Sequence, residues 1–298
     1  MQSDLISARV PGPLGEAMEL RAAHYKASGD PKATFFCLPG GGMTRRYFDL
    51  GGPYSFVERM TSLGYALICA DHVGIGENSL GEDAAFTPRD AARVMVEAIP
   101  SLQSAAGVSD VPLLGLGHSM GGFMTALIQG GHSPYAAIAL LGAHAGGLDW
   151  GLDENEKSYA NRPDALEPVL VDLARKKFGK FFFDQPGPSE NSKIFGGENA
   201  GANDELRKAT APVYAAGGLM SMIEGSILTE AQAVRCPIFF AFGDNDIGRT
   251  PYLAPKEFTS SPDIRLIILP STGHNSFAFA SIDGLCEKLD KWAREVTS

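Results

Sequence analysis

The sequence predicts an α/β protein with a mostly parallel, doubly wound sheet and an inserted helical cap. Short, fully apolar runs alternate with amphipathic helical stretches over the first half of the chain, a pattern typical of parallel strands covered on both faces. The same alternation returns near the end. Between the two, residues 149–232 are rich in Gly, Pro, Asn and Ser, have helical stretches on either side and contain no strong strand. We therefore assign residues 1–148 and 233–298 to the α/β core and 149–232 to a mostly helical cap.

The predicted strands are recognised by continuous apolar runs that are too short for helices. The stretch "AMELRAAHYKA" differs, because it alternates loosely and is expected at the edge of the sheet in an antiparallel pair. The apolar runs are "ATFFCLP" (33–39), "YALICAD" (65–71), "VPLLGLG" (111–117), "YAAIALLGA" (135–143), "CPIFFAFGD" (236–244) and "DIRLIILP" (263–270).

The predicted helices show apolar residues spaced by threes and fours. Residues 53–64 form a helix that Gly64 ends, and residues 88–107 form one with Pro88 near its start. We expect Pro100 to end or kink the latter helix. Residues 120–131 form a third. The last helix carries an apolar stripe of Phe279, Ile282, Leu285, Leu289, Trp292 and Val296.

Composition and charge exclude several classes of protein. The formal net charge is −10 and no stretch is densely basic, which argues against a nucleic-acid partner. No window approaches the roughly eighteen apolar residues of a membrane helix, and the first twenty residues lack the apolar core of a secretory signal. The four cysteines show no CxxC spacing and predict free, buried thiols in a reducing compartment. We expect a cytoplasmic protein that acts on a small molecule; the sequence predicts no oligomeric state.

The stretch "LLGLGHSMGGFM" (113–124) holds the first candidate for chemistry. Gly117, Ser119 and Gly121 form a G-x-S-x-G pattern between a predicted strand and a predicted helix. One interpretation is that Ser119 only caps the helix. The other is that the glycines allow a sharp, strained turn, which exposes the hydroxyl as a nucleophile beside the positive helix N-terminus. Side chains at the two glycine positions would then collide with neighbouring backbone.

A serine nucleophile needs a general base, and His274 is the candidate among the six histidines. It lies in "LPSTGHNSFAF", between the last strand and the last helix, at the edge of the sheet where active sites of open α/β sheets collect. His118 is adjacent to Ser119 and is expected to point away from it. His144 also follows a strand and is a candidate for the pocket wall.

The acid that orients the base is sought directly after the penultimate strand. The stretch "FFAFGDNDIGRTP" offers Asp244 and Asp246. Asp246 lies farther into the loop and is better placed to reach His274, whereas Asp244 is the alternative, with a turn or capping role as its simpler interpretation. Asp149, after another strand, is a third candidate.

Acyl transfer also needs hydrogen-bond donors for an oxyanion. The glycine-rich stretch "CLPGGGMT" (37–44) follows a strand and offers consecutive backbone N–H groups, and the N–H of Met120 would be the second donor. The stretch has neither the Lys-Ser/Thr of a P-loop nor GxGxxG spacing, which argues against nucleotide binding.

Taken in order, "LPGGG", "ADHVGIGENS", "GHSMGG", "FGDND" and "TGHNS" resemble the α/β-hydrolase fold family over nearly the whole chain. The resemblance implies Ser119 as nucleophile, Asp246 as acid and His274 as base, with Gly41 and Met120 as the oxyanion hole. Pro39 stands where many members have histidine, so Gly40 and Gly42 remain alternatives. A serine at position 119 excludes the branches with an aspartate nucleophile.

The implied activity is that of a serine esterase. Ser119 would attack a carbonyl carbon and form an acyl-enzyme, which water then hydrolyses, and no metal or organic cofactor is needed. We expect an ester, lactone or thioester of a small to medium apolar molecule, with Gly42, His144, Phe182 and Met220 contacting it. Several apolar cap residues are pocket candidates or, alternatively, the cap's own core: Phe181, Phe182, Phe183, Met220, Met222 and Ile223.

Two other functions compete with this prediction. The same triad serves carbon–carbon bond hydrolysis of a diketone in the family that the chain resembles. Some members of that family instead keep the fold as receptors or scaffolds without catalysis.

Overall fold

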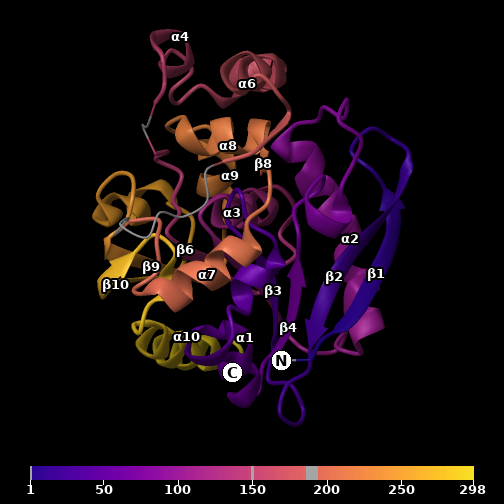
Figure 1. The fold of residues 1–298 in the computed structure, drawn as a ribbon, viewed down its shortest axis with the longest axis vertical. Coiled ribbons are helices and arrows are strands. Elements are labelled where there is room, and N and C mark those ends of the chain that lie inside the picture. Colours follow the sequence, from indigo (N-terminus) through magenta and orange to yellow (C-terminus); the bar gives the residue numbers. More distant parts are fainter. Residues whose placement is uncertain (1, 149–150, 186–193) are drawn as a thin grey trace.

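A computed structural model describes residues 2–148, 151–185 and 194–298 (Figure 1). Its main sheet has eight strands in the order β1-β2-β4-β3-β5-β6-β9-β10. All neighbouring strands from β4 to β10 are parallel, and β2 runs antiparallel to both β1 and β4. The predicted mostly parallel sheet is therefore confirmed. The strands are β1 (Asp4–Pro11), β2 (Ala17–Tyr25), β3 (Thr34–Leu38), β4 (Ala66–Ala70), β5 (Leu113–His118), β6 (Ala137–Leu141), β9 (Ile238–Asn245) and β10 (Ile264–Gly273).

The apolar strands are buried because both faces of the sheet are covered. Every residue of β3, β4, β5 and β6 is buried. Successive side chains of a strand point to opposite faces, so Phe36 and Leu38 join one core cluster while Phe35 and Cys37 join the other. A continuous apolar run is thus the sequence that this environment requires.

The edge of the sheet differs from the prediction. The stretch expected at the edge is β2, the second strand, and β1 is the edge strand that the sequence analysis missed. In β1 the side chains of Ile6, Ala8 and Val10 are buried, whereas the residues between them are exposed. This period-two alternation is the signal of a half-buried strand.

Helices cover the sheet on both sides. The first core cluster includes residues of α2 and α3, and the second includes residues of α1 and α10, whose predicted stripe is buried up to Trp292. The helices of the core are α1 (Phe56–Ser62), α2 (Pro88–Ala106), α3 (Met120–His132) and α10 (Ile282–Val296). Short 3-10 helices are η1 (Arg45–Phe48), η2 (Gly52–Tyr54), η3 (Gly76–Asn78), η4 (Glu167–Val169), η5 (Pro251–Glu257) and η6 (Ser276–Ala278).

Pro100 was predicted to end or kink its helix, and the first of these alternatives is wrong, because α2 continues to Ala106. Proline removes the N–H that would bond the carbonyl four residues earlier, at Val96. Pro100 is exposed and Val96 is only half-buried, so water can reach that carbonyl and the helix continues. A capping box between Thr87 and Asp90 fixes the start of the helix.

Between β6 and β9 the chain forms a mainly helical segment. The helices are α4 (Glu154–Lys157), α5 (Pro163–Leu166), α6 (Leu170–Phe178), α7 (Ala200–Ala209), α8 (Ala215–Met222) and α9 (Leu228–Ala233). Figure 1 shows α4 and α6 at one end of the molecule, with α8 beneath them. Two strands that were not predicted, β7 (Phe182–Phe183) and β8 (Val213–Tyr214), pair antiparallel. Strands of two residues carry no periodicity from which to predict them.

Two further predictions concern the cysteines and membrane-spanning helices. All four cysteines are free and buried, as their spacing predicted. Over the ranges that the structure covers, no helix has both the length and the apolar character required to cross a bilayer.

Candidate active site

The turn between β5 and α3 holds Ser119 in a strained conformation. Its backbone has φ 51° and ψ −122°, a positive φ that residues other than glycine rarely adopt. Backbone bonds fix the turn: Ser119 N–H donates to Leu141 O at 2.8 Å, and Phe123 N–H donates to Ser119 O at 3.0 Å. Although Ser119 occupies the N-cap position of α3, its side chain makes no capping hydrogen bond. The hydroxyl is therefore not used as a helix cap.

The two glycines of the pattern are required by close backbone contacts. A Cβ atom at Gly117 would lie 2.2 Å from the carbonyl oxygen of Gly121. A Cβ atom at Gly121 would lie 2.1 Å from the carbonyl oxygen of Leu38, on β3. Real Cβ atoms do not approach backbone so closely, which confirms the collision predicted for both positions.

His274 and Asp246 form a buried pair. The Nδ1 atom of His274 lies 2.6 Å from Oδ1 of Asp246, and the two side chains are only 5% and 8% exposed. Asp246 also accepts the backbone N–H of Ile247 at 2.7 Å and that of Gly243 at 3.2 Å. Burial by itself would raise the pKa of Asp246, but the charge of His274, its hydrogen bond and the Ile247 N–H outweigh burial and lower that pKa. The carboxylate is therefore ionised and holds the imidazole with Nδ1 as donor.

The third candidate acid, Asp149, lies outside the residues that the structure describes. The alternative acid, Asp244, bonds to the end of β10. Its carboxylate is exposed and accepts the backbone N–H groups of Ser271 at 2.8 Å and Thr272 at 2.9 Å. Asp244 thus ties the end of β9 to the end of β10. These bonds, with that of Thr272 the largest cause, lower the pKa of Asp244.

The end of β6 brings the serine and the His–Asp pair together. Leu141 accepts the N–H of Ser119, and a Cβ atom on the next residue, Gly142, would lie 3.1 Å from Oδ2 of Asp246 and 3.2 Å from the ring of His274. Ser119 and His274 also line one cavity of about 590 Å³. The structure therefore gathers all three predicted catalytic residues at the carboxyl edge of the sheet, from loops after β5, β9 and β10.

The loop that carries His274 is held from two sides by groups that sequence analysis did not identify. From the cap segment, Ile194 O accepts the His274 N–H at 2.7 Å and Phe195 O accepts the Asn275 side-chain amide at 2.6 Å. From the core side, His118 Nε2 lies 2.8 Å from His274 O. The ring of His118, which was expected to point away from the serine, is buried and lies 4.7 Å, centre to centre, from the ring of His274. Long-range contacts of this kind leave no periodic signal in a sequence.

The glycine-rich loop lies against the serine turn. A Cβ atom at Gly40 would lie 3.4 Å from the Cβ of Ser119, and one at Gly41 would lie 3.5 Å from the Cβ of Met120. His72 holds the base of this loop, because its Nε2 lies 2.7 Å from Pro39 O. Since a carbonyl can only accept, His72 is the donor, and burial lowers the pKa of this neutral ring.

The wall of the cavity is mostly apolar. Gly42 lines it, as predicted for a substrate contact, and so do the backbones or side chains of Gly41 and Met120. The cap contributes Phe178, Phe183, Val213 and Met222 among others, while Lys177 adds a cation whose Nζ is 2.8 Å from the buried Glu156. Because this lysine is already paired, its charge is neutralised within the wall.

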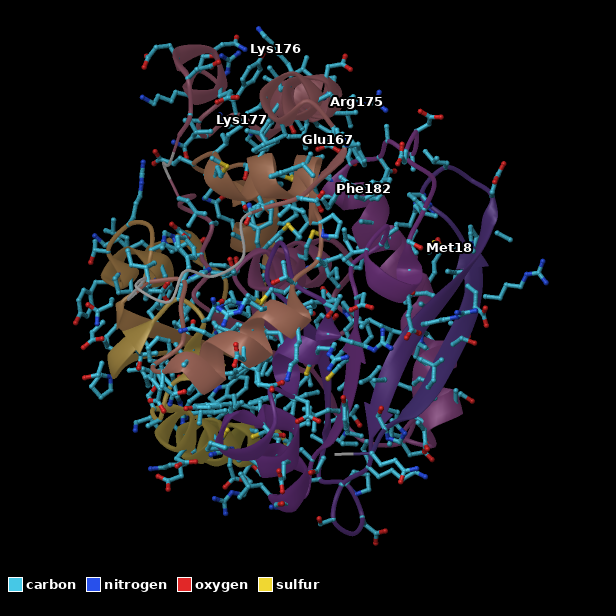
Figure 2. All side chains as sticks on the ribbon, in the orientation of Figure 1. Met18, Glu167, Arg175, Lys176, Lys177 and Phe182 are labelled. Carbon is cyan, nitrogen blue, oxygen red and sulfur yellow. The ribbon has the colours of Figure 1, made fainter. Side chains whose placement is uncertain are left out.

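Three predicted substrate contacts do not line this cavity. His144 is buried beside Glu257, with 3.1 Å between Nδ1 and Oε1. The ring of Phe182, labelled in Figure 2, packs against that of Phe86, with 6.3 Å between the ring centres. Met220 is fully buried in the core, on the opposite side of α8 from the cavity-lining Gly218 and Met222. For Phe181, Met220 and Ile223 the alternative interpretation, that they form core, agrees with their burial.

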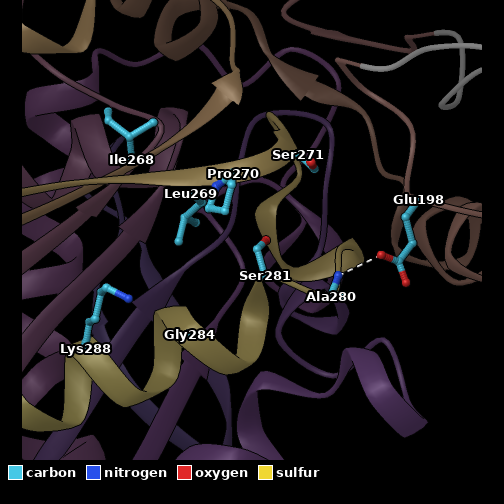
Figure 3. Close-up of a pocket in the computed structure, with 9 residues that line it drawn as sticks. All are labelled: Glu198, Ile268, Leu269, Pro270, Ser271, Ala280, Ser281, Gly284 and Lys288. Atoms are coloured by element: carbon cyan, nitrogen blue, oxygen red, sulfur yellow. Dashed lines mark hydrogen bonds between the residues drawn. The ribbon is translucent and has the colours of Figure 1, made fainter.

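A second cavity of about 290 Å³ lies between the end of β10 and α10 (Figure 3). Glu198 and Ser281 are engaged with neighbours: Glu198 accepts the Ala280 N–H at 2.8 Å and the Tyr54 hydroxyl at 2.9 Å, and Ser281 accepts the hydroxyl of Thr272. It contains no nucleophile paired with a base. Among the residues described, no three His, Cys, Asp or Glu side chains gather into a group that could hold a metal ion.

Comparison with known proteins identifies the family of this chain. A family model described as "Alpha/beta hydrolase family" matches residues 35–286, which is most of the chain. The chain belongs to this family. The match spans the strand before the glycine-rich loop, the serine turn and the loops of Asp246 and His274. No curated protein sequence matches the chain.

Solved structures share the α/β-hydrolase fold at low sequence identity. A highly thermostable carboxyl esterase from Bacillus coagulans has a TM-score of 0.72 and 16% identity, with 99% of each chain covered. A thermophilic esterase from Thermogutta terrifontis has a TM-score of 0.63 and 16% identity, covering 98% of this chain and 100% of its own. A lipase in an open form has a TM-score of 0.67 and 18% identity, covering 99% and 100%. At these identities the similarity establishes the fold.

Proposed function

We propose that this α/β hydrolase is a serine hydrolase that cleaves a carboxylic ester, lactone or thioester through an acyl-enzyme on Ser119. One observation carries the proposal. The hydroxyl of Ser119, in a strained turn and not used as a cap, lines an apolar cavity together with a histidine whose other ring nitrogen is held by a buried carboxylate. Backbone strain costs stability, and strained residues cluster at functional sites.

The residues divide the reaction between them. With Nδ1 of His274 bonded to Asp246, Nε2 is the acceptor that takes the proton of Ser119 as the hydroxyl oxygen attacks the carbonyl carbon. The oxygen of the tetrahedral intermediate is stabilised by the N–H of Met120, at the positive N-terminus of α3, and by that of Gly41. His274 then donates the proton to the leaving group. Water, deprotonated by the same imidazole, finally releases the acyl group from Ser119.

The wall of the cavity supports a neutral, apolar substrate of small to medium size. Aromatic and aliphatic side chains dominate the wall, and its lysine is paired with Glu156. Desolvating a charged chain there would cost free energy without an unpaired partner to offset it. The names of the similar structures, two esterases and a lipase, are consistent with this class.

Ester turnover in matched serine variants tests the proposal. A panel of p-nitrophenyl esters is assayed with the wild type, with Ser119→Ala and with Ser133→Ala, a second positive-φ serine at the exposed C-terminal end of α3. We expect turnover in the wild type and the Ser133 variant and none above background in the Ser119 variant. Turnover that persists in Ser119→Ala would contradict the proposal. A wild type that hydrolyses no ester, lactone or thioester would favour the carbon–carbon or binding alternatives.

A further inference from the structure

His118 joins the nucleophile's turn to the base's loop. It precedes Ser119 directly, and its Nε2 lies 2.8 Å from the backbone oxygen of His274, 156 residues away. Its ring is 1% exposed and packs between the rings of Tyr47, at 4.6 Å, and His274, at 4.7 Å.

The contact determines which nitrogen of His118 carries the proton. A carbonyl oxygen can only accept, so Nε2 must be the donor. Nδ1 has no hydrogen-bond partner and lies against Gly40, where a Cβ atom would approach it to 2.8 Å. The ionisable groups around the ring are His274, Asp246 and Tyr47. Burial, and then the charge of His274, lower the pKa of His118 to about 3, while its bond to His274 O and Asp246 oppose this. The ring is neutral, with its proton on Nε2.

A fixed donor at this position restrains the base. The carbonyl of His274 accepts two hydrogen bonds, one from Nε2–H of His118 and one from the N–H of Ser276 at 2.9 Å within its own loop. Only the bond from His118 ties this carbonyl to the strand that leads into Ser119. The N–H of His274 is held by Ile194 O from the cap. His274 is thus held at both backbone groups, and its ring is held by Asp246. These contacts leave the His274 side chain little freedom to move relative to the cavity that it shares with Ser119.

We propose that His118 is a positioning residue: as a neutral Nε2–H donor to the backbone of His274, it sets the base relative to Ser119. This inference rests on the proposed function, because it assigns His274 the role of base. Displacing a catalytic group by about 1 Å can cost on the order of a hundredfold in rate. The loss should therefore appear mainly in kcat. His118 does line the cavity, but it is only 1% exposed and offers a substrate little surface, so KM should change little.

Substitutions that keep or remove the donor test the inference. The amide nitrogen of Gln can reach the place of Nε2, whereas that of Asn falls near Nδ1. We expect His118→Leu and His118→Asn to lower kcat by roughly 10- to 100-fold with KM within about twofold. We expect His118→Gln to recover most of the wild-type kcat. His132→Leu, at an exposed histidine that ends α3, is the matched control and should be unchanged. Equal kcat in the Leu and Gln variants would overturn the inference.

A nuclear magnetic resonance measurement on the wild type covers the case in which the Leu variant does not fold. In protein with ¹⁵N-labelled histidine, the ring of His118 should have a protonated Nε2 and an unprotonated Nδ1 at every pH from 5 to 9. A proton on Nδ1, or titration in this range, would overturn the inference. This readout needs no turnover, so it separates failure of the inference from failure of the proposed function. A wild type that hydrolyses none of the esters but has the expected tautomer would contradict only the latter.

Discussion

At the scale of single residues, several groups of the candidate site are held in arrangements that cost stability. Ser119 is held at a positive φ, and the hydroxyl is left out of the capping role that its position offers. Asp246 is buried, and its charge is compensated by His274 and by backbone N–H groups. The sequence predicts these residues because the proposed chemistry demands particular residue types at the ends of strands. It does not predict the contacts of His118 and Ile194 with His274, because these contacts join distant segments.

The glycine at position 121 should be intolerant of any side chain. In Gly121→Ala the new Cβ would meet the backbone of Leu38 at 2.1 Å, so β3 and α3 would have to separate. We expect the free energy of unfolding to fall by more than about 3 kcal/mol, or the protein to be insoluble. In the control, Gly131→Ala, the new Cβ meets nothing within 4 Å near the end of the same helix. Helix propensity should then raise stability by about 0.5–1 kcal/mol in urea unfolding. Equal stability of the two variants would contradict the contact.

Substitutions of the two aspartates at the end of β9, Asp244 and Asp246, should differ in their effect on ester turnover. In Asp246→Asn the amide cannot fix the protonated Nδ1 of His274, so we expect kcat for an ester to fall by roughly 10³- to 10⁴-fold. In Asp244→Asn the exposed side chain loses charge-assisted bonds to Ser271 and Thr272, and kcat should stay within about threefold. Steady-state kinetics of both variants decides this. The reverse ranking would assign the acid to Asp244.

At the scale of elements, the sequence predicted what a short-range pattern can encode. Strands β3 to β6 and β9 were recognised because burial on both faces demands continuous apolar runs. The pair β7–β8 was missed because two residues carry no period. The residues that line the cavity were predicted less accurately than the strands. Gly42 lines the cavity, but Phe182 packs against Phe86 and Met220 is buried in the core. Which apolar side chain of a cap faces a cavity depends on how its helices are rotated, and composition does not fix that rotation.

Removing the proline inside α2 should stabilise this helix. Pro100 is exposed and interrupts the hydrogen bond to the carbonyl of Val96, which the helix tolerates at a cost. We expect Pro100→Ala to raise the free energy of unfolding by about 1–3 kcal/mol, measured by urea titration. Ester turnover should not change, because α2 contributes no residue to the cavity wall. A loss of stability would show that the proline ring makes packing contacts that outweigh the missing bond.

At the scale of the whole molecule, neutral buried histidines should couple stability to pH. Burial lowers the pKa values of His72 and His118, the latter from 6.5 to about 3. Above pH 6.5 both are neutral in the folded and unfolded states. Below it the unfolded chain binds protons that the folded protein does not, so stability falls as pH falls, by up to about 1.4 kcal/mol per pH unit for each histidine.

The window between pH 6.5 and 5 isolates this effect, because ordinary carboxyl groups titrate below it. Urea unfolding of the wild type and of His118→Gln at several pH values measures the slope. The variant should have a shallower slope, by up to about 1.4 kcal/mol per pH unit, since glutamine does not titrate. Identical slopes would mean that His118 binds its second proton in the folded protein as readily as in the unfolded chain, contrary to the lowered pKa that burial gives it.

Covalent labelling tests the central claim, a serine made nucleophilic by the His274–Asp246 pair, most directly. The wild type and His274→Ala are incubated with a fluorophosphonate, and the modified peptide is identified by mass spectrometry. We expect a single adduct on Ser119 in the wild type, with the labelling rate reduced by at least a hundredfold in the histidine variant. An adduct on a different residue, or equal labelling rates in the two proteins, would contradict the claim.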